Sequence, residues 1–274
     1  MSAKRPIGVF DSGVGGLSVL QALRAELPCE DFIYIADSGH APYGERGDAF
    51  VSARTRAIAQ HLRDQHRIKA LVVACNTATA AAAHLVRAEH PDLPLVGLEP
   101  ALKPAVASTR TGRIGVMGTR GTVTSAKFRT LLSAYQNQSA FVVQPCDGLA
   151  HAIEQSAERP GADAMKTRAL CARYTRAMGQ FGTEPGEIDT LVLGCTHYFF
   201  AIPELRELLG EHVQLIATGE PVARQTRRLL SVKGELSVAG SGVTQLFTTG
   251  QPAALQAAAQ RWLQLDAAAG SLHF

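Results

Sequence analysis

The sequence predicts an α/β fold: two pseudo-symmetric α/β domains with largely parallel sheets, and an active site in the interdomain cleft. Short apolar runs alternate with longer helical patterns, several of these runs are apolar throughout, and three segments recur in the same order. Strands that alternate with helices are typical of βαβ units and a parallel sheet. The chain of 274 residues is 46% hydrophobic and 19% charged. It is therefore long enough for one large or two small domains.

The expected strands are the short apolar runs at 7–10, 32–36, 71–74, 95–98, 114–117, 141–144, 191–193 and 213–216. The expected helices lie between them, at about 17–27, 50–66, 79–90, 122–135, 148–157, 163–179, 203–209 and 220–231. A run such as 71–74, which has no polar residue, suits a strand that is covered on both faces.

Three matched pairs of segments indicate an internal duplication. The pairs are 7–10 with 114–117, 32–37 with 141–147, and 71–75 with 191–195. The spacing widens in the second half, which places an insertion in the Gly- and Pro-punctuated stretch 158–187. Strand and helix patterns continue to the C-terminus, so we expect them to complete the first half. The expected domains are 1–98 plus 214–274, and 99–213.

Charge and cysteine content exclude several classes of protein. The 27 Lys and Arg residues against 24 Asp and Glu residues give a net charge of +3, and the basic residues are scattered, so we expect no nucleic-acid partner. The N-terminus lacks the apolar core of a signal peptide, and the longest apolar run, 70–83, is interrupted by polar residues, so we expect no membrane segment. The five cysteines show no C-x-x-C spacing, which favours a reduced, cytoplasmic compartment and no metal site.

The segment 11–16, Asp-Ser-Gly-Val-Gly-Gly, follows an expected strand and opens an expected helix, as a dinucleotide-binding loop does. We reject that function because Ser18 replaces the third glycine and because the charge of Asp11 opposes a pyrophosphate. Two interpretations stay open. One is a helix N-terminus that binds a carboxylate with help from the Ser12 hydroxyl. The other is a tight turn capped by Asp11 or Ser12.

The duplication puts Cys75 and Cys195 at equivalent places, each at the carboxyl end of a strand and each followed by polar residues. Ligand sites of α/β sheets lie at such ends. A cysteine is more often a buried core residue, and we keep that interpretation for Cys29, Cys146 and Cys171.

Two cysteines that face each other across a cleft suit the inversion of a stereocentre. One thiolate removes a proton from one face, and the other thiol delivers a proton to the opposite face. A thiol pKa of about 8.5 is within reach of neutral pH. Asp11 is a candidate partner for one thiol and His197 for the other, with a local cap or a locally bonded helix start as the alternative for each.

Four motifs in order resemble the cofactor-independent glutamate racemases of the aspartate/glutamate racemase superfamily. They are 10–16, Asp37-Ser38 with Pro42-Tyr43-Gly44, 74–79 and 194–198, and the resemblance runs from about residue 5 to residue 230. It implies interconversion of L- and D-glutamate without pyridoxal phosphate or any other cofactor, which supplies D-glutamate for bacterial peptidoglycan. It also implies a cytoplasmic enzyme that forms a homodimer.

The resemblance also implies roles for individual residues. Cys75 and Cys195 are the expected acid/base pair, assisted by Asp11 and His197. The expected substrate-binding residues are Asp11, Ser12, Tyr43, Gly44, Asn76, Thr77, Thr119, Thr122, Glu154, Thr196 and His197.

Two departures from the family pattern are Phe199-Phe200, where Pro and Leu are common, and 217–219, where an acidic residue is common. Two other functions stay open. A racemase for aspartate or another amino acid is one, although aspartate racemases tend to carry an acidic residue at the position of His197. A regulator that binds a nucleotide or an amino acid at an inactive site is the other, and the intact cysteine pair opposes it.

Overall fold

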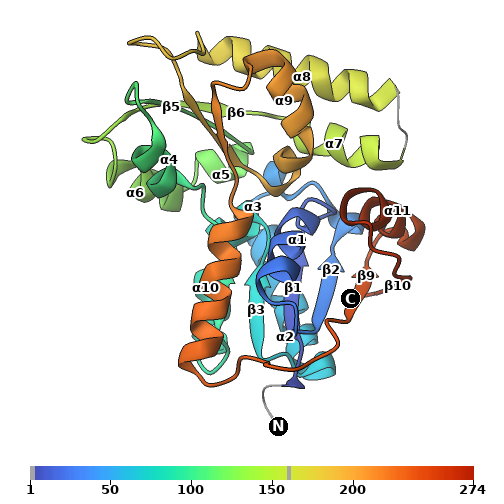
Figure 1. Cartoon of the computed structure of the whole chain (residues 1–274). Helices are drawn as coiled ribbons and strands as arrows, with labels where there is room; N and C mark the ends of the chain where they lie inside the picture. The colour runs from blue at the N-terminus through green and yellow to red at the C-terminus, as the bar shows by residue number, and fades with distance from the viewer. Residues whose placement is uncertain (1–3, 159–161) are drawn as a thin grey trace.

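The computed structural model describes residues 4–158 and 162–274. They form two lobes, each built on a parallel sheet with helices on both faces (Figure 1). The larger sheet comprises β1 (Ile7–Asp11), β2 (Phe32–Ala36), β3 (Ala70–Val73), β4 (Leu95–Gly97), β9 (Thr244–Thr248) and β10 (Ala269–Ser271). The smaller sheet comprises β5 (Arg113–Gly118), β6 (Ala140–Pro145), β7 (Thr190–Gly194) and β8 (Gln214–Ile216). The predicted fold class is confirmed.

The first lobe carries helices α1 (Leu17–Glu26), α2 (Asp48–His66), α3 (Asn76–Glu89), α10 (Gly219–Val232) and α11 (Pro252–Leu263). The second carries α4 (Leu102–Ser108), α5 (Arg120–Val123), α6 (Ala126–Ser133), α7 (Leu149–Glu158), α8 (Ala162–Met178) and α9 (Ile202–Leu209). Three short 3-10 helices lie near the junction of the lobes in the described residues. After β2 come η2 (Ser38–His40) and η3 (Tyr43–Glu45), and after β7 comes η4 (Thr196–Ala201).

The two sheets repeat one strand order. The larger sheet runs β10-β9-β2-β1-β3-β4 and the smaller runs β6-β5-β7-β8, so β2-β1-β3-β4 and β6-β5-β7-β8 are equivalent series. The matched segments of the sequence fall on the equivalent pairs β1/β5, β2/β6 and β3/β7. Helix α8 makes up most of the expected insertion at 158–187. Residues 159–161 of that insertion lie outside the described residues.

Three details of the second lobe differ from the sequence-based expectations. The expected boundary at 213/214 precedes β8, yet β8 pairs with β7. An apolar run is equally suited to either sheet, so only its pairing partner decides to which sheet, and therefore to which lobe, the strand belongs. The expected helix 122–135 is two helices, because Ser125 caps α6 by accepting the N–H of Phe128. Helix α4, which was not expected, holds Pro104 in its first turn, where no N–H is needed.

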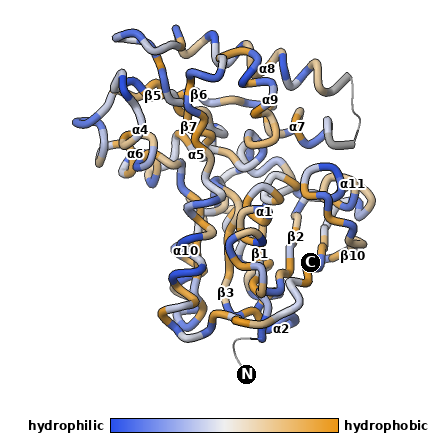
Figure 2. The backbone as a smooth tube through the Cα atoms, viewed as in Figure 1, coloured by the Kyte–Doolittle hydropathy of each residue, from blue (hydrophilic) through white to orange (hydrophobic). Residues whose placement is uncertain are grey.

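The central strands of both sheets are buried on both faces, as their apolar sequences predict. Every residue of β1, β2 and β7 is buried. Figure 2 shows hydrophobic residues along the strands at the centre of each lobe. Within residues 4–158 and 162–274, no helix has the length and apolar character that crossing a membrane requires. From the pairing of β8 we propose that the second domain extends through residue 216 before the chain returns to the first.

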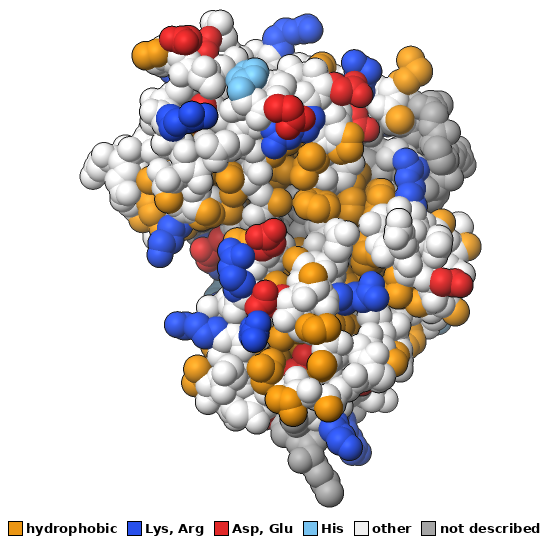
Figure 3. Space-filling view, viewed as in Figure 1, with side chains coloured by type: hydrophobic (Ala, Val, Ile, Leu, Met, Phe, Trp, Pro, Cys, Tyr) orange, Lys and Arg blue, Asp and Glu red, His pale blue; other side chains and the backbone are white. Residues whose placement is uncertain are grey.

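The lobes meet through aromatic and polar contacts beside the carboxyl ends of both sheets. Trp262 of α11 stacks on Phe200 of η4, with ring centroids 3.8 Å apart. The amide nitrogen of Asn76 donates to the carbonyl of Gly194 at 2.9 Å. Figure 3 shows hydrophobic side chains gathered across the middle of the visible face, with Lys and Arg scattered elsewhere. The departure at Phe200 therefore has a structural use, because its ring joins the two lobes.

Candidate active site

A cavity of about 440 Å³ lies between the carboxyl ends of the two sheets. Of the expected site residues, those that line it are Ser12, Tyr43, Gly44, Cys75, Asn76, Thr77, Thr119, Glu154, Cys195, Thr196 and His197. Asp11 and Thr122 do not line it and lie just behind its wall, buried. Among the described residues, no group of three or more His, Cys, Asp or Glu side chains is arranged to hold a metal ion.

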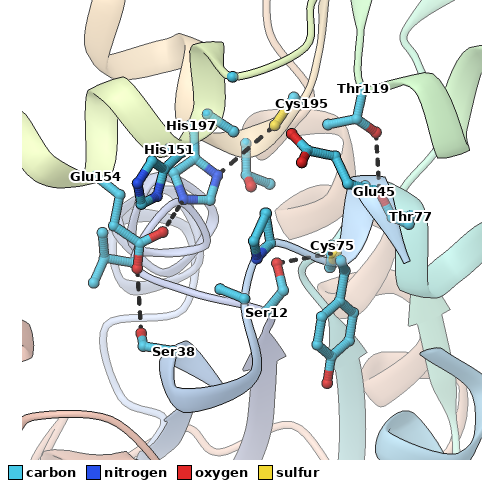
Figure 4. A pocket seen from close by; sticks show the side chains of 18 of the residues that line it. Ser12, Ser38, Glu45, Cys75, Thr77, Thr119, His151, Glu154, Cys195 and His197 are labelled. Atoms are coloured by element: carbon cyan, nitrogen blue, oxygen red, sulfur yellow. Dashed lines mark hydrogen bonds and ion pairs between the residues drawn. The ribbon is translucent and has the colours of Figure 1, made fainter. Parts of the chain in front are cut away.

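Cys75 and Cys195 reach this cavity from opposite lobes (Figure 4). Cys75 follows β3 with φ −136° and ψ 120°, and Cys195 follows the equivalent strand β7 with φ −146° and ψ 138°. Each is the extended residue at which a strand turns into a helix. The duplicated fold thus presents two thiols in one backbone conformation to a shared space.

The sulfur of Cys75 is linked to Asp11 through Ser12. The thiol donates to the Ser12 hydroxyl at 3.6 Å, and that hydroxyl donates to a carboxylate oxygen of Asp11 at 3.4 Å. Burial and then the negative charge of Asp11 raise the pKa of the Cys75 thiol well above its ordinary value. The neutral thiol is therefore the favoured form of Cys75.

Asp11 is completely buried at the end of β1. Its other oxygen accepts the backbone N–H of Gly16 at 2.6 Å, so the loop 11–16 is a turn closed by its own aspartate. Burial raises the pKa of Asp11 from 3.8 to about 6, against the opposing effects of His197 and the Gly16 N–H. Its carboxyl group is therefore able to change protonation state near neutral pH.

Cys195 has a different environment, made of His197 and Glu154. The sulfur of Cys195 lies 3.7 Å from Nδ1 of His197, and Nε2 of that ring lies 3.0 Å from Oε2 of Glu154. The second oxygen of Glu154 accepts the Ser38 hydroxyl at 3.3 Å. Burial opposes protonation of the ring, but hydrogen bonds to Cys195 and Glu154 raise the pKa of His197 well above its ordinary value. Cys195 thus faces an imidazolium, which stabilises a thiolate.

Three threonine hydroxyls form a cluster on the side of the cavity next to Cys75. The Thr77 hydroxyl lies 3.0 Å from that of Thr119, which lies 2.9 Å from that of Thr122. Thr122 is the innermost of the three and supports the other two from behind the wall. Hydroxyl donors of this kind, together with backbone N–H groups, suit the binding of a carboxylate.

Asp37 anchors the wall that carries Tyr43. Its carboxylate accepts the Tyr43 hydroxyl at 2.5 Å, two guanidinium N–H groups of Arg54 at 2.8 and 2.9 Å, and the Thr249 hydroxyl at 2.7 Å. Burial alone raises the pKa of this group, but the bonds from Arg54, Tyr43 and Thr249 outweigh it and lower the pKa of Asp37. Asp37 belongs to one of the four sequence motifs, but its role as this anchor is visible only in the structure.

We expect Asp37→Asn to lower the free energy of unfolding at pH 7 by roughly 3 kcal/mol, because it leaves the largely buried Arg54 without its carboxylate. A depressed pKa contributes stability above the ordinary value of 3.8, and this contribution is lost as pH falls through the lower folded value. The difference between the variant and the wild type should therefore narrow below pH 3.8. Urea unfolding at pH 7 and pH 3 measures it, with Asp64→Asn on the exposed face of α2 as the control. An equal gap at both pH values would contradict this assignment.

Several residues that line the cavity were missed by the sequence analysis. Gln251 and Ala254 come from the start of α11, at the far end of the chain, and no local pattern marks them. Cys146, interpreted as a core residue, is buried and also borders the cavity. It follows β6, the strand equivalent to β2, so its place at a carboxyl strand end was a usable signal. His151 on α7 also lines the cavity.

Comparisons with known proteins show which family the chain resembles. The model of the family described as Asp/Glu/Hydantoin racemase matches residues 7–226. The chain is 46% identical to the glutamate racemase of Ectopseudomonas mendocina over 255 residues, 93% of each chain. Among solved structures, it matches the glutamate racemase of Bacillus anthracis with a TM-score of 0.86 and 32% identity, covering 98% of both chains.

Another solved match is the Escherichia coli glutamate racemase in complex with L-glutamate and the activator UDP-MurNAc-Ala, with a TM-score of 0.82 and 31% identity over 97% of each chain. A third is the Francisella tularensis enzyme in complex with D-glutamate, with a TM-score of 0.83 and 25% identity, covering 99% of this chain and 98% of that one. These matches extend along nearly the whole length of the chain. The chain belongs to the Asp/Glu/Hydantoin racemase family.

Proposed function

We propose that this protein interconverts L- and D-glutamate without a cofactor, with Cys75 and Cys195 as its two acid/base residues. The observation that carries the proposal is the presence of two thiols on equivalent strand ends, facing one cavity, each with its own proton partner. The relatives that it matches at 44–48% identity are glutamate racemases, and two solved relatives hold L- or D-glutamate. Its product would supply D-glutamate for bacterial peptidoglycan.

We infer the starting roles of the two sulfurs from their surroundings. Cys195, 3.7 Å from the ring of His197, is the first proton acceptor, and Cys75, whose thiol pKa is raised by burial, is the first proton donor. An enantiomer whose Cα–H bond points at Cys195 loses its proton to that sulfur. The Cys75 thiol then transfers its proton to the opposite face of the carbanion, which inverts the centre. The sulfurs leave this step with exchanged protonation states, which are the states that the other enantiomer requires.

The polar groups of the cavity match the charges of glutamate. The hydroxyls of Ser12, Thr77 and Thr119 are donors for its carboxylates. The side-chain amide of Asn76 donates to Gly194, which leaves its buried oxygen without a hydrogen-bond partner in the described structure. A buried acceptor of this kind is suited to an ammonium group. We therefore place the substrate ammonium near the Asn76 oxygen, with the carboxylates toward the hydroxyls.

The purified protein, incubated with either enantiomer of glutamate in deuterated water without added cofactor, should exchange the α-proton and reach an equal mixture of the two. Proton NMR follows the exchange, and circular dichroism follows the inversion. L-Aspartate, run in parallel, tests the alternative substrate and should react far more slowly. Absence of both exchange and inversion with glutamate would overturn the proposal.

We propose a cytoplasmic location and a homodimer as well. The location is supported by the free thiols of all five cysteines, since disulfides are rare in that reducing compartment. The homodimer is inferred from the family resemblance, and light scattering after size-exclusion chromatography tests it.

A further inference from the structure

The glycine loop of the first lobe lies directly against the His197–Glu154 pair of the second. A Cβ atom built on Gly15 would lie 2.3 Å from Nδ1 and 2.6 Å from Cγ of His197. A Cβ atom on Gly13 would lie 2.5 Å from Oε2 and 2.7 Å from Oε1 of Glu154. Real Cβ atoms do not approach other heavy atoms so closely, so any side chain at either position must displace the pair.

The backbone does not explain these two glycines. Neither Gly13 nor Gly15 is among the glycines with positive φ, so an alanine is compatible with the conformation of both. The space above them, occupied by side chains of the opposite lobe, is what requires the absence of a Cβ.

We infer that Gly13 and Gly15 are positioning residues for the proposed racemisation: they form a flat seat on which the His197–Glu154 pair docks, and the seat holds the imidazole against Cys195. This inference rests on the proposed function. It assigns a use to the glycines of a loop that resembles a dinucleotide-binding turn. The pair fills the space over Gly13 and Gly15 that a pyrophosphate would need.

The seat itself is held in place from both sides. The Tyr34 hydroxyl donates to the carbonyl of Gly13 at 2.8 Å from within the first lobe. The Ser18 hydroxyl lies 2.8 Å from the carbonyl of Gly15 and 3.2 Å from that of Thr196 in the second lobe. Because these bonds fix the loop, an added methyl group is relieved by movement of the pair rather than of the loop.

The two positions differ in how that movement occurs. Glu154 meets the seat with the end of a flexible side chain, which can swing away and give up its bonds to His197 and Ser38. His197 meets it with a rigid ring that is only 5% exposed. A methyl group at Gly15 therefore drives the ring itself away from Cys195.

We expect Gly15→Ala to lower kcat by about 100-fold, the lower range for loss of general acid/base catalysis, with KM changed by no more than a few-fold. The control is Gly47→Ala, whose added Cβ meets nothing within 4 Å and whose φ is −71°. With glutamate deuterated at Cα, the isotope effect should rise for the enantiomer deprotonated by Cys195 and fall for the other. Unchanged kcat, or a loss with equal isotope effects, would overturn the inference.

A readout that needs no activity separates this inference from the proposed function. NMR of ¹³C-labelled histidine, with the His197 signal assigned from His197→Asn, follows protonation of that ring. The wild-type ring should stay protonated well above pH 6.5, and in Gly15→Ala its midpoint should fall. An unchanged His197 signal in Gly15→Ala would overturn the inference, whatever the activity of that variant. A wild type that does not racemise glutamate refutes the proposed function but leaves this measurement meaningful.

Gly13→Ala supplies a second test, should Gly15→Ala fold poorly. Its effect passes through Glu154, so the kcat loss should be smaller than for Gly15→Ala, and Gly13→Ala should add no loss to a Glu154→Ala variant. This double-mutant cycle reports the coupling of two contacting residues. Losses that multiply on that background would show that Gly13 acts by another route and would overturn its part in the seat.

Discussion

Cys75→Ser and Cys195→Ser should each lower the rate of racemisation by about 10²–10⁴-fold, the range for loss of a general acid or base. A hydroxyl does not ionise near neutral pH, so it cannot replace the thiolate, and inversion needs both partners. Each variant should retain slow exchange of the α-proton of one enantiomer only, since one sulfur still removes and returns hydrogen on its own face. The enantiomer that exchanges should be opposite in Cys75→Ser and Cys195→Ser.

Proton NMR in deuterated water measures exchange of each enantiomer, and circular dichroism measures inversion. The matched control is Cys29→Ser, because Cys29 is a free cysteine that does not line the cavity. It should keep wild-type activity. Full racemisation by either of the other two variants would refute the two-base assignment.

Asp11→Asn is expected to remove most of the activity while making the fold more stable. Burial raises the pKa of Asp11 to about 6. Its carboxylate is linked to the Cys75 thiol by two hydrogen bonds through the Ser12 hydroxyl. Protonation below pH 6 neutralises the carboxylate that can take a proton at the end of that path, so wild-type activity should fall on the acidic side of about pH 6. The variant should lose about 10²-fold in kcat and lack this acidic limb. The full wild-type profile should be bell-shaped, since one thiol must be ionised and the other not.

The stability effect has the opposite sign. A folded pKa near 6 against 3.8 in the unfolded chain means that this group contributes stability below pH 3.8, and that the contribution is lost as pH rises through 6. At pH 8 the buried charge lowers the free energy of unfolding by an amount on the order of 1–3 kcal/mol. Asp11→Asn should therefore unfold at a higher urea concentration than the wild type at pH 8, and at a similar one near pH 4. A variant that is less stable at pH 8 would contradict the assigned pKa.

Local pattern was sufficient for most of the fold. Apolar runs and their spacing located all strands of the equivalent series β2-β1-β3-β4 and β6-β5-β7-β8, because a buried parallel strand must be apolar on both faces. The resemblance between the two halves of the chain then placed Cys75 and Cys195 at the ends of equivalent strands. The sequence located β8 but did not show which sheet it joins, because its apolar run fits either one. It also did not show that α11 borders the cavity, because that place depends on the packing of the whole first lobe.

The sequence by itself determined where eight of the strands lie along the chain, the duplication and the two thiols at equivalent places in its two halves. Only the tertiary structure decided how each thiol is tuned. Ser38 meets Glu154 from 116 positions away, and Asn76 meets Gly194 from 118 positions away. The same holds for the docking of Glu154 and His197 onto Gly13 and Gly15. Periodicity records which face of an element is buried, whereas these contacts depend on how the two sheets are placed relative to each other.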